Sequence, residues 1–150
     1  MSLSGVVDLI KRHEGLSLTP YRCTTGHHTI GYGHNIDANP LTGYIDFYFV
    51  QNGHITEDMA DYLLDRDIIE AGKWANIYTV SWSSLSQNRK YVIVSMLFNL
   101  GLEGFLSFKR MRAAIEAGDF SRAADEMKDS LWYTQVGKRS QELERMMREG

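Results

Sequence analysis

The chain has 150 residues and a mass of 17.2 kDa, which is too short for two ordinary independent domains, so one compact unit is expected. Hydrophobic residues make up 43% and charged residues 23%, and the net charge of −3 gives no reason to expect nucleic acid binding. The single cysteine, Cys23, excludes an intramolecular disulfide. No apolar run approaches the roughly 18 residues of a membrane span and the first residues lack the apolar core of a signal peptide, so no stable membrane insertion is expected.

The first predicted helix runs from Ser4 to about Gly15. Glu14 falls in its last turn, where the negative end of the helix dipole disfavours a charged carboxylate and favours the protonated acid, a useful proton donor. Between Leu18 and Ile36, β-branched and aromatic residues separated by Gly and Thr predict short antiparallel strands. Residues 37–54 are expected to be irregular.

Thr56 begins the clearest predicted helix, which extends to about residue 77. Its apolar stripe at helical spacing comprises Ala60, Leu63, Leu64, Ile68, Ala71, Trp74 and Ala75. Asp67 falls on the same stripe, where a carboxylate is costly unless it is paired. We therefore expect Asp67 to have a partner, and a histidine from the hairpin region is a good candidate.

The remainder is predicted to be helical, with an apolar central helix closed by Gly101, a helix ending at Gly118, another capped by Asp119, and a charged helix from about Gly137. The expected fold class is α+β, in a single domain. A small N-terminal lobe with a short antiparallel sheet (about 12–58) is followed by a connecting helix (about 56–77) and a helical C-terminal lobe (about 78–150) that the N-terminal helix joins. A groove is expected between the lobes.

Three residues carry the chemistry that we consider first: Glu14, Cys23 nine positions later, and Thr29 six further on. Taken singly, each has a common structural explanation, as a solvated glutamate, a small core cysteine and a good strand former. His27 and His28 could suggest a metal, but adjacent residues on a strand point to opposite faces and nothing supplies the remaining ligands. No metal or other cofactor is expected.

The joint pattern resembles a known family. The sequence EGL at 14–16, Tyr21, Thr25-Gly26 and TIGYGH at 29–34 are together similar to the N-terminal signature of the phage-type lysozymes, the T-even phage lysozyme and its relatives. That pattern is a glutamate, eight residues, an aspartate or occasionally a cysteine, five residues, and a threonine. Later segments resemble the connecting helix, the central C-terminal helix and the aromatic segment of the family: ITEDMADYLLDRDI at 55–68, MLFNLG at 96–101 and LWYTQ at 131–135.

The resemblance implies a lysozyme-like fold and cleavage of the β-1,4 bond between N-acetylmuramic acid and N-acetylglucosamine in peptidoglycan. Glu14 would protonate the glycosidic oxygen. Cys23 would stand where most members carry a second acid, which assists water or stabilises the cationic transition state. A thiol with an ordinary pKa of about 8.5 is mostly neutral at pH 7, although its thiolate fraction could act as base or nucleophile. Thr29 can hold the attacking water.

The resemblance also implies supporting residues. His34 and Asp67 match a structural ion pair of the family, and Arg139 is similar to an arginine that faces the catalytic glutamate. The residues that match the sugar-binding groove are Tyr32, Asn35, Phe98, Asn99, Phe105 and Gln135. Core packing is an equal alternative for the aromatic members of that set.

The expectation is a monomeric phage or prophage endolysin, made in the bacterial host cytoplasm and released to the periplasm and cell wall, with peptidoglycan as its partner. Two alternatives remain. A lytic transglycosylase needs one acid and no partner that activates water, which the replacement of an acid by Cys23 favours. A non-catalytic peptidoglycan-binding module is also considered, but pure binding has no need of the acid at Glu14.

Overall fold

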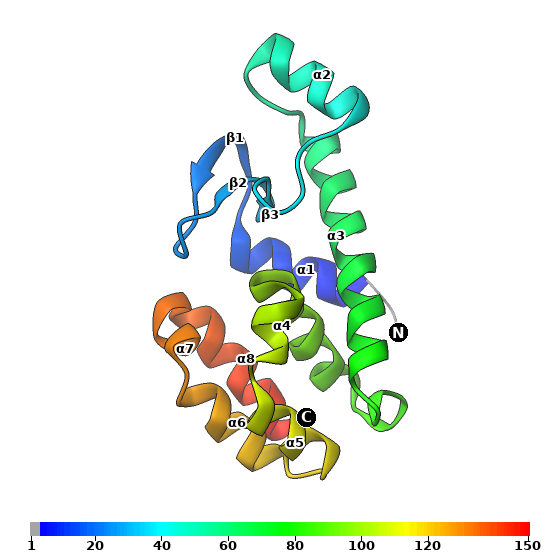
Figure 1. The fold of residues 1–150 in the computed structure, drawn as a ribbon, viewed down its shortest axis with the longest axis vertical. Coiled ribbons are helices and arrows are strands. Elements are labelled where there is room, and N and C mark those ends of the chain that lie inside the picture. Colours follow the sequence, from blue (N-terminus) through cyan, green and yellow to red (C-terminus); the bar gives the residue numbers. More distant parts are fainter. Residues whose placement is uncertain (1–3) are drawn as a thin grey trace. The chain divides into compact units, whose positions relative to one another are not determined.

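The computed structural model describes residues 4–150 (Figure 1). The helices are α1 (Ser4–Glu14), α2 (Gly43–Asn52), α3 (Glu57–Tyr78), α4 (Gln87–Leu106), α5 (Lys109–Glu116), α6 (Phe120–Lys128), α7 (Leu131–Val136) and α8 (Lys138–Glu149), with a 3₁₀ turn at Trp82–Ser84. The strands are β1 (Ser17–Arg22), β2 (His28–Gly31) and β3 (His34–Asn35), which form one antiparallel sheet in the order β1-β2-β3. The predicted α+β class is confirmed.

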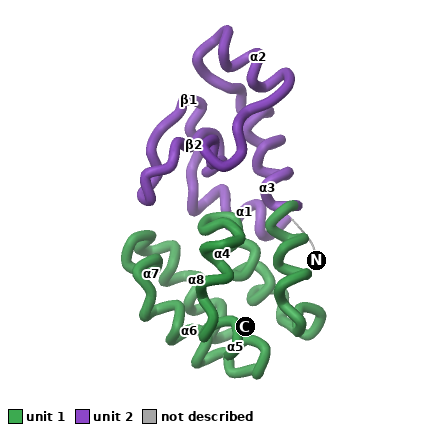
Figure 2. The backbone as a smooth tube through the Cα atoms, viewed as in Figure 1, with its two compact units in different colours: residues 1–2, 70–150 green, residues 3–69 purple. Residues whose placement is uncertain are grey.

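The chain forms two compact units (Figure 2). The first ends at Ile69 and holds α1, the sheet, α2 and the start of α3, while the second is Glu70–Gly150. Helix α3 therefore begins in one unit and ends in the other. This division groups α1 with the sheet, whereas the lobes expected from the sequence join it to the helical part. Those expected lobe boundaries, and the groove between the lobes, stay predictions.

In the first unit, the start of α3 packs against the sheet at a glycine. A Cβ atom added to Gly31 would lie 3.3 Å from the Cβ of Ala60, so the absence of a side chain at Gly31 lets α3 approach β2 closely. The N–H of Ile55, just before α3, donates to the carbonyl of Leu18 in β1 at 2.9 Å. The sheet that carries the candidate site is thus fixed to the helix that follows it.

The expectation that residues 37–54 are irregular was wrong for ten of them, because Gly43–Asn52 forms α2. The segment is apolar nearly all round, so it lacks the one-sided periodicity by which an amphipathic helix is recognised. Gly53 ends the helix in the left-handed conformation with φ +72°, and its N–H donates to the carbonyl of Phe49 at 2.7 Å. No residue of α2 is buried.

The second unit is helical and has its own core. Helix α4 supplies a buried run from Tyr91 to Leu97, and its backbone leaves helical geometry at Gly101, where the sequence predicts a helix end. Helices α4 and α6 pack against α8, and α5 packs against α6. The predicted cap at Asp119 is present, since its side chain accepts the N–H of Arg122 at 3.1 Å.

Within residues 4–150, no single helix is long and apolar enough to cross a membrane. Only α4 and α5 taken together pass on length and composition, and that pair is bent by 104°.

Candidate active site

Glu14 is the last residue of α1 and lies against the turn between β2 and β3. A Cβ atom added to Gly33 would lie 2.5 Å from both Cδ and Oε2 of Glu14, and 2.8 Å from Cγ. Such distances are far shorter than any real contact, so only glycine can occupy position 33 without moving the carboxylate. Gly33 also has φ +74°, a backbone conformation that favours glycine. The turn after β2 therefore fixes one side of Glu14.

Cys23 and Thr29 are held by the same acceptor. The carbonyl oxygen of His27 accepts the backbone N–H of Cys23 at 3.0 Å and the hydroxyl of Thr29 at 2.9 Å. Thr29 is 2% exposed, whereas Cys23 is half-buried. Two of the three residues with expected chemistry are thus fixed at one end of the β1-β2 hairpin.

The sulfur of Cys23 faces a second threonine, with 3.1 Å between Cys23 Sγ and Thr25 Oγ1. Partial burial raises the pKa of the Cys23 thiol, but hydrogen bonds lower it by more, so the pKa lies below its usual value. The largest of these bonds comes from the Thr25 side chain, followed by backbone groups of Thr25 and His27 and by the Thr29 side chain. A larger thiolate fraction at neutral pH follows.

His34 makes two hydrogen bonds through its ring. Nδ1 lies 2.7 Å from Asp67 Oδ2, and Nε2 lies 2.8 Å from the carbonyl oxygen of Asn39. Both partners are acceptors, so both ring nitrogens must donate, which only the imidazolium ion can do. Burial lowers the pKa of His34, but the bonds to Asp67 and Asn39 raise it by more, and the net direction is upward. Asp67 has the partner that its place on the apolar stripe requires.

The other candidate residues of the first unit are engaged in its structure. Tyr32 is 9% exposed, and the ammonium of Lys11 lies 4.9 Å from its ring centroid. Lys11 is also 2.8 Å from Asp61 on α3. The side-chain oxygen of Asn35 accepts the N–H of Ala38 at 3.0 Å and closes the turn after β3.

The remaining candidates belong to the second unit. Asn99 accepts the indole N–H of Trp132 at 2.6 Å, and Trp132 is 4% exposed. Phe105 is 1% exposed, which favours the packing alternative for its ring. Phe98 on α4 is half-buried and Gln135 on α7 is exposed.

Arg139 is the second residue of α8 and is half-buried. Its expected position facing Glu14 stays a prediction, as do the expected sugar contacts of the second unit.

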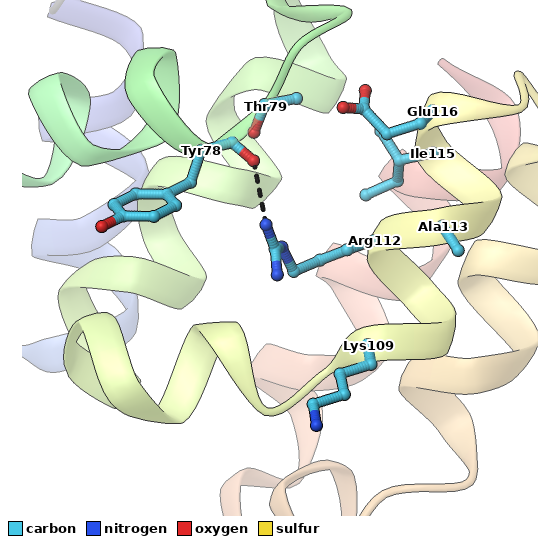
Figure 3. Close-up of a pocket in the computed structure, with 7 residues that line it drawn as sticks. All are labelled: Tyr78, Thr79, Lys109, Arg112, Ala113, Ile115 and Glu116. Carbon is cyan, nitrogen blue, oxygen red and sulfur yellow. Dashed lines mark hydrogen bonds between the residues drawn. The ribbon is translucent and has the colours of Figure 1, made fainter.

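A pocket of about 210 Å³ lies within the second unit, between the end of α3 and one face of α5 (Figure 3). It involves none of the candidate residues. Glu116 accepts the backbone N–H groups of Val80 at 2.7 Å and Ser81 at 2.9 Å, and Arg112 donates to the carbonyl of Tyr78 at 3.2 Å. Two charged side chains of α5, Arg112 and Glu116, therefore bind the end of α3 and the turn that follows it.

Histidines 27 and 28 do not form part of a metal centre in the part of the chain that the structure describes, where no three metal-ligating side chains gather. His28 instead pairs with Asp37, with 3.0 Å between Nδ1 and Oδ1, and its backbone N–H donates to the same carboxylate at 2.9 Å.

Sequence reasoning missed three contributors to the site: the side chain of Thr25, the carbonyl of His27, and Gly33 as the glycine that admits Glu14. Thr25 and Gly33 both lie within the lysozyme-like motif, but a motif does not show which hydroxyl faces the sulfur of Cys23 or which glycine faces the carboxylate of Glu14. Backbone carbonyls carry no signal in a sequence at all.

Comparison with known proteins supports one family. The model of the phage lysozyme family matches residues 11–149. The chain is 31% identical to "Probable T4-type lysozyme 2" of Dictyostelium discoideum over 92% of this chain and 90% of the relative. It is 34% identical to "Endolysin" of Acyrthosiphon pisum secondary endosymbiont phage 1, over 84% of this chain and 76% of the relative.

A third relative is larger. The chain is 29% identical to "Pre-baseplate central spike protein Gp5" of Enterobacteria phage T4, over 90% of this chain but only 26% of that protein, so it spans about a quarter of the length of this relative. The family model covers nearly the whole chain, and with it Glu14 at the end of α1, the hairpin of Cys23 and Thr29, and the helical second unit. The chain therefore belongs to the phage lysozyme family.

Proposed function

We propose that this peptidoglycan hydrolase is a muramidase, which cleaves the β-1,4 bond between N-acetylmuramic acid and N-acetylglucosamine with Glu14 as general acid. Membership of the phage lysozyme family supports a glycoside hydrolase that acts on peptidoglycan. The observation that carries the finer proposal is the fit of the Glu14 carboxylate against Gly33, because a general acid must be held in one position to protonate a poor leaving group.

In the proposed reaction, protonated Glu14 donates its proton to the glycosidic oxygen as the bond from that oxygen to the anomeric carbon breaks. Water then adds to the anomeric carbon and loses a proton to the Cys23 thiolate, which leaves a hydroxyl on the sugar. Thr29 already donates its only hydroxyl proton to His27, so its oxygen can accept a hydrogen bond from that water. Thr29 would orient the water while Cys23 takes its proton.

The second unit would supply sugar contacts from Asn99, Phe98 and Gln135, together with Tyr32 and Asn35 of the first unit. Arg139 would face the carboxylate of Glu14. We place His34 and Asp67 outside the chemistry, as a buried pair that holds α3 to β3.

The proposed biological role is that of an endolysin acting as a monomer, made in the cytoplasm of a bacterial host and released to the cell wall to lyse the host. The name of the 34% identical relative, "Endolysin", supports this role. The proposed substrate is peptidoglycan itself, with no metal or other cofactor.

A second candidate function is lytic transglycosylation, favoured by the specific observation that a thiol stands at the position of the second acid. In that reaction the sugar's own hydroxyl replaces water and the product carries an internal anhydro ring, so no partner for water is needed. The hydrogen bonds around the sulfur of Cys23 support the hydrolase, because they favour a thiolate that can accept a proton.

Mass spectrometry of the fragments released from purified Gram-negative peptidoglycan separates these possibilities. Products with a reducing-end muramic acid are expected for the wild type and none for Glu14→Gln, which keeps the size of the side chain and removes the acid. Anhydro-muramic products would make the chain a transglycosylase. Peptidoglycan that is bound but not cleaved would mean that the protein is a binding module. Cleavage by Glu14→Gln would mean that Glu14 is not the general acid.

A further inference from the structure

We propose that Thr25 is a positioning residue for Cys23, whose hydroxyl holds the sulfur in place and donates a hydrogen bond to the thiolate. The inference rests on the proposed function, in which Cys23 accepts a proton from water. An aspartate at this position would be ionised at pH 7 without help, whereas a thiol with an ordinary pKa is mostly neutral there. A cysteine in this role therefore needs a hydrogen-bond donor beside its sulfur, because the donor stabilises the thiolate.

The geometry of the turn brings Thr25 to the sulfur. The N–H of Gly26 donates to the carbonyl of Cys23 at 2.9 Å, and the N–H of Cys23 donates to the carbonyl of His27 at 3.0 Å. Gly26 has φ +86°, which lets the chain reverse here. The reversal places Thr25 Oγ1 at 3.1 Å from Cys23 Sγ, within hydrogen-bond reach of a sulfur atom.

Thr25 has its hydroxyl proton available for this bond, whereas the proton of Thr29 is already engaged, and the Thr29 side chain comes last among the hydrogen bonds that lower the pKa of Cys23. Thr29 is 2% exposed and donates to the carbonyl of His27 at 2.9 Å. A hydroxyl has only one proton, so Thr29 can support the thiolate only by giving up that bond. The two threonines therefore have different roles, since the Thr29 hydroxyl is bound to a backbone carbonyl of the hairpin and the Thr25 hydroxyl faces the sulfur.

The charged groups of the same hairpin are directed elsewhere. Arg22 donates to the carbonyl of Gly26 at 3.0 Å, and His28 pairs with Asp37. His27 is exposed and contributes its backbone rather than its ring. Burial raises the pKa of Cys23 and so acts against the thiolate. Hydrogen bonds lower this pKa, and the largest of them comes from the Thr25 side chain.

The test is the pH dependence of alkylation of the intact protein by iodoacetamide, which reports the thiolate directly because Cys23 is the only cysteine. Thr25→Val keeps the shape of the side chain and removes the donor. We expect its alkylation profile to move to higher pH, with a rate at pH 7 about threefold lower, as follows from the loss of one hydrogen bond to a charged, partly exposed group.

Two further variants complete the design. Thr25→Ser restores the donor and should follow the wild type, and so should Thr24→Val, which makes the same change at the neighbouring exposed position. A Thr25→Val profile that superimposes on the wild type overturns the proposal. Equal shifts in all three variants also overturn it, because they would mean a general loosening of the turn. Thermal unfolding of each variant checks that the hairpin is folded.

The failure of this inference is distinguishable from failure of the proposed function. Alkylation needs no substrate, so it measures the support of the thiolate by Thr25 even in a protein that cleaves nothing. If alkylation shifts as expected while Glu14→Gln still releases wall fragments, the proposed mechanism is wrong and the contact of Thr25 with the thiolate stands. If Glu14→Gln is inactive and the alkylation profiles coincide, the mechanism stands and Thr25 has no part in it.

Discussion

Gly33 and Glu14 approach each other so closely that a single methyl group on Gly33 would overlap the carboxylate, with 2.5 Å between the added carbon and Glu14 Oε2. The two residues come from different elements, one ending α1 and the other lying in the turn between β2 and β3. The position of the proposed general acid therefore depends on a glycine 19 positions later in the chain.

Gly33→Ala should lower wall-clearing activity about a hundredfold, because a displacement of about 1 Å is enough to misplace a catalytic group. The control is Gly118→Ala, between α5 and α6, which has a similar φ of +72° but no atom within 4 Å of the added Cβ. Both variants should lose about 1 kcal/mol of stability to backbone strain. Turbidity clearing of permeabilised Gram-negative cells measures the difference, and equal activity of the two variants would contradict the positioning of Glu14 by Gly33.

The pair of His34 and Asp67 should make stability depend on pH. Because the folded state raises the pKa of His34, its contribution is fully present below about 6.5, the ordinary value for histidine, and is lost as pH rises through the folded pKa. His34→Gln should cost about 3 kcal/mol at pH 6 and progressively less at higher pH. Urea unfolding between pH 5.5 and 9 gives the difference from the wild type.

The matched control for this pair is His28→Gln, which removes an exposed histidine that also faces a carboxylate. Exposed ion pairs contribute little, so this variant should change stability by less than about 1 kcal/mol. A His34→Gln penalty that stays constant across the pH range would mean that His34 does not hold its extra proton in the folded protein.

Substitutions of Cys23 should follow the ability of the side chain to accept a proton at pH 7. Cys23→Asp should keep clearing activity, because a carboxylate is ionised there, whereas Cys23→Ser should lose it by about tenfold or more, because a hydroxyl is not. The clearing rate under reducing conditions is the measurement. Clearing by Cys23→Ser at the wild-type rate would exclude a base at this position and would favour the transglycosylase.

Asn99 should contribute to stability through Trp132. Asn99→Ala leaves the buried indole N–H without the oxygen that accepts it at 2.6 Å, which should cost about 1–3 kcal/mol. Asn99→Asp keeps an acceptor and should cost less. Gln135→Ala changes an exposed side chain and should stay within about 0.5 kcal/mol of the wild type. Chemical denaturation compares the three, and equal stability of Asn99→Ala and Gln135→Ala would contradict the structural role.

Much of the fold was predictable because its signals are local. Helical spacing marked α3, Asp119 marked the start of α6, and the cluster of Thr and Gly at 24–26 marked the turn between β1 and β2. Helix α2 was missed because its ten residues are apolar nearly all round and so have no periodicity that distinguishes a helix from an irregular segment. A segment without such a pattern gives no local indication of its secondary structure.

The sequence by itself determined the candidates and their spacing, namely Glu14, Cys23 and Thr29, and it required a partner for Asp67, because a lone carboxylate on an apolar face is costly whatever the fold. Only the tertiary structure decided which groups meet. It set Gly33 against Glu14, one carbonyl of His27 between Cys23 and Thr29, and Thr25 beside the sulfur. Periodicity and spacing describe neighbours along the chain, whereas these contacts depend on the register of the strands and the path of the turns that bring separate segments together.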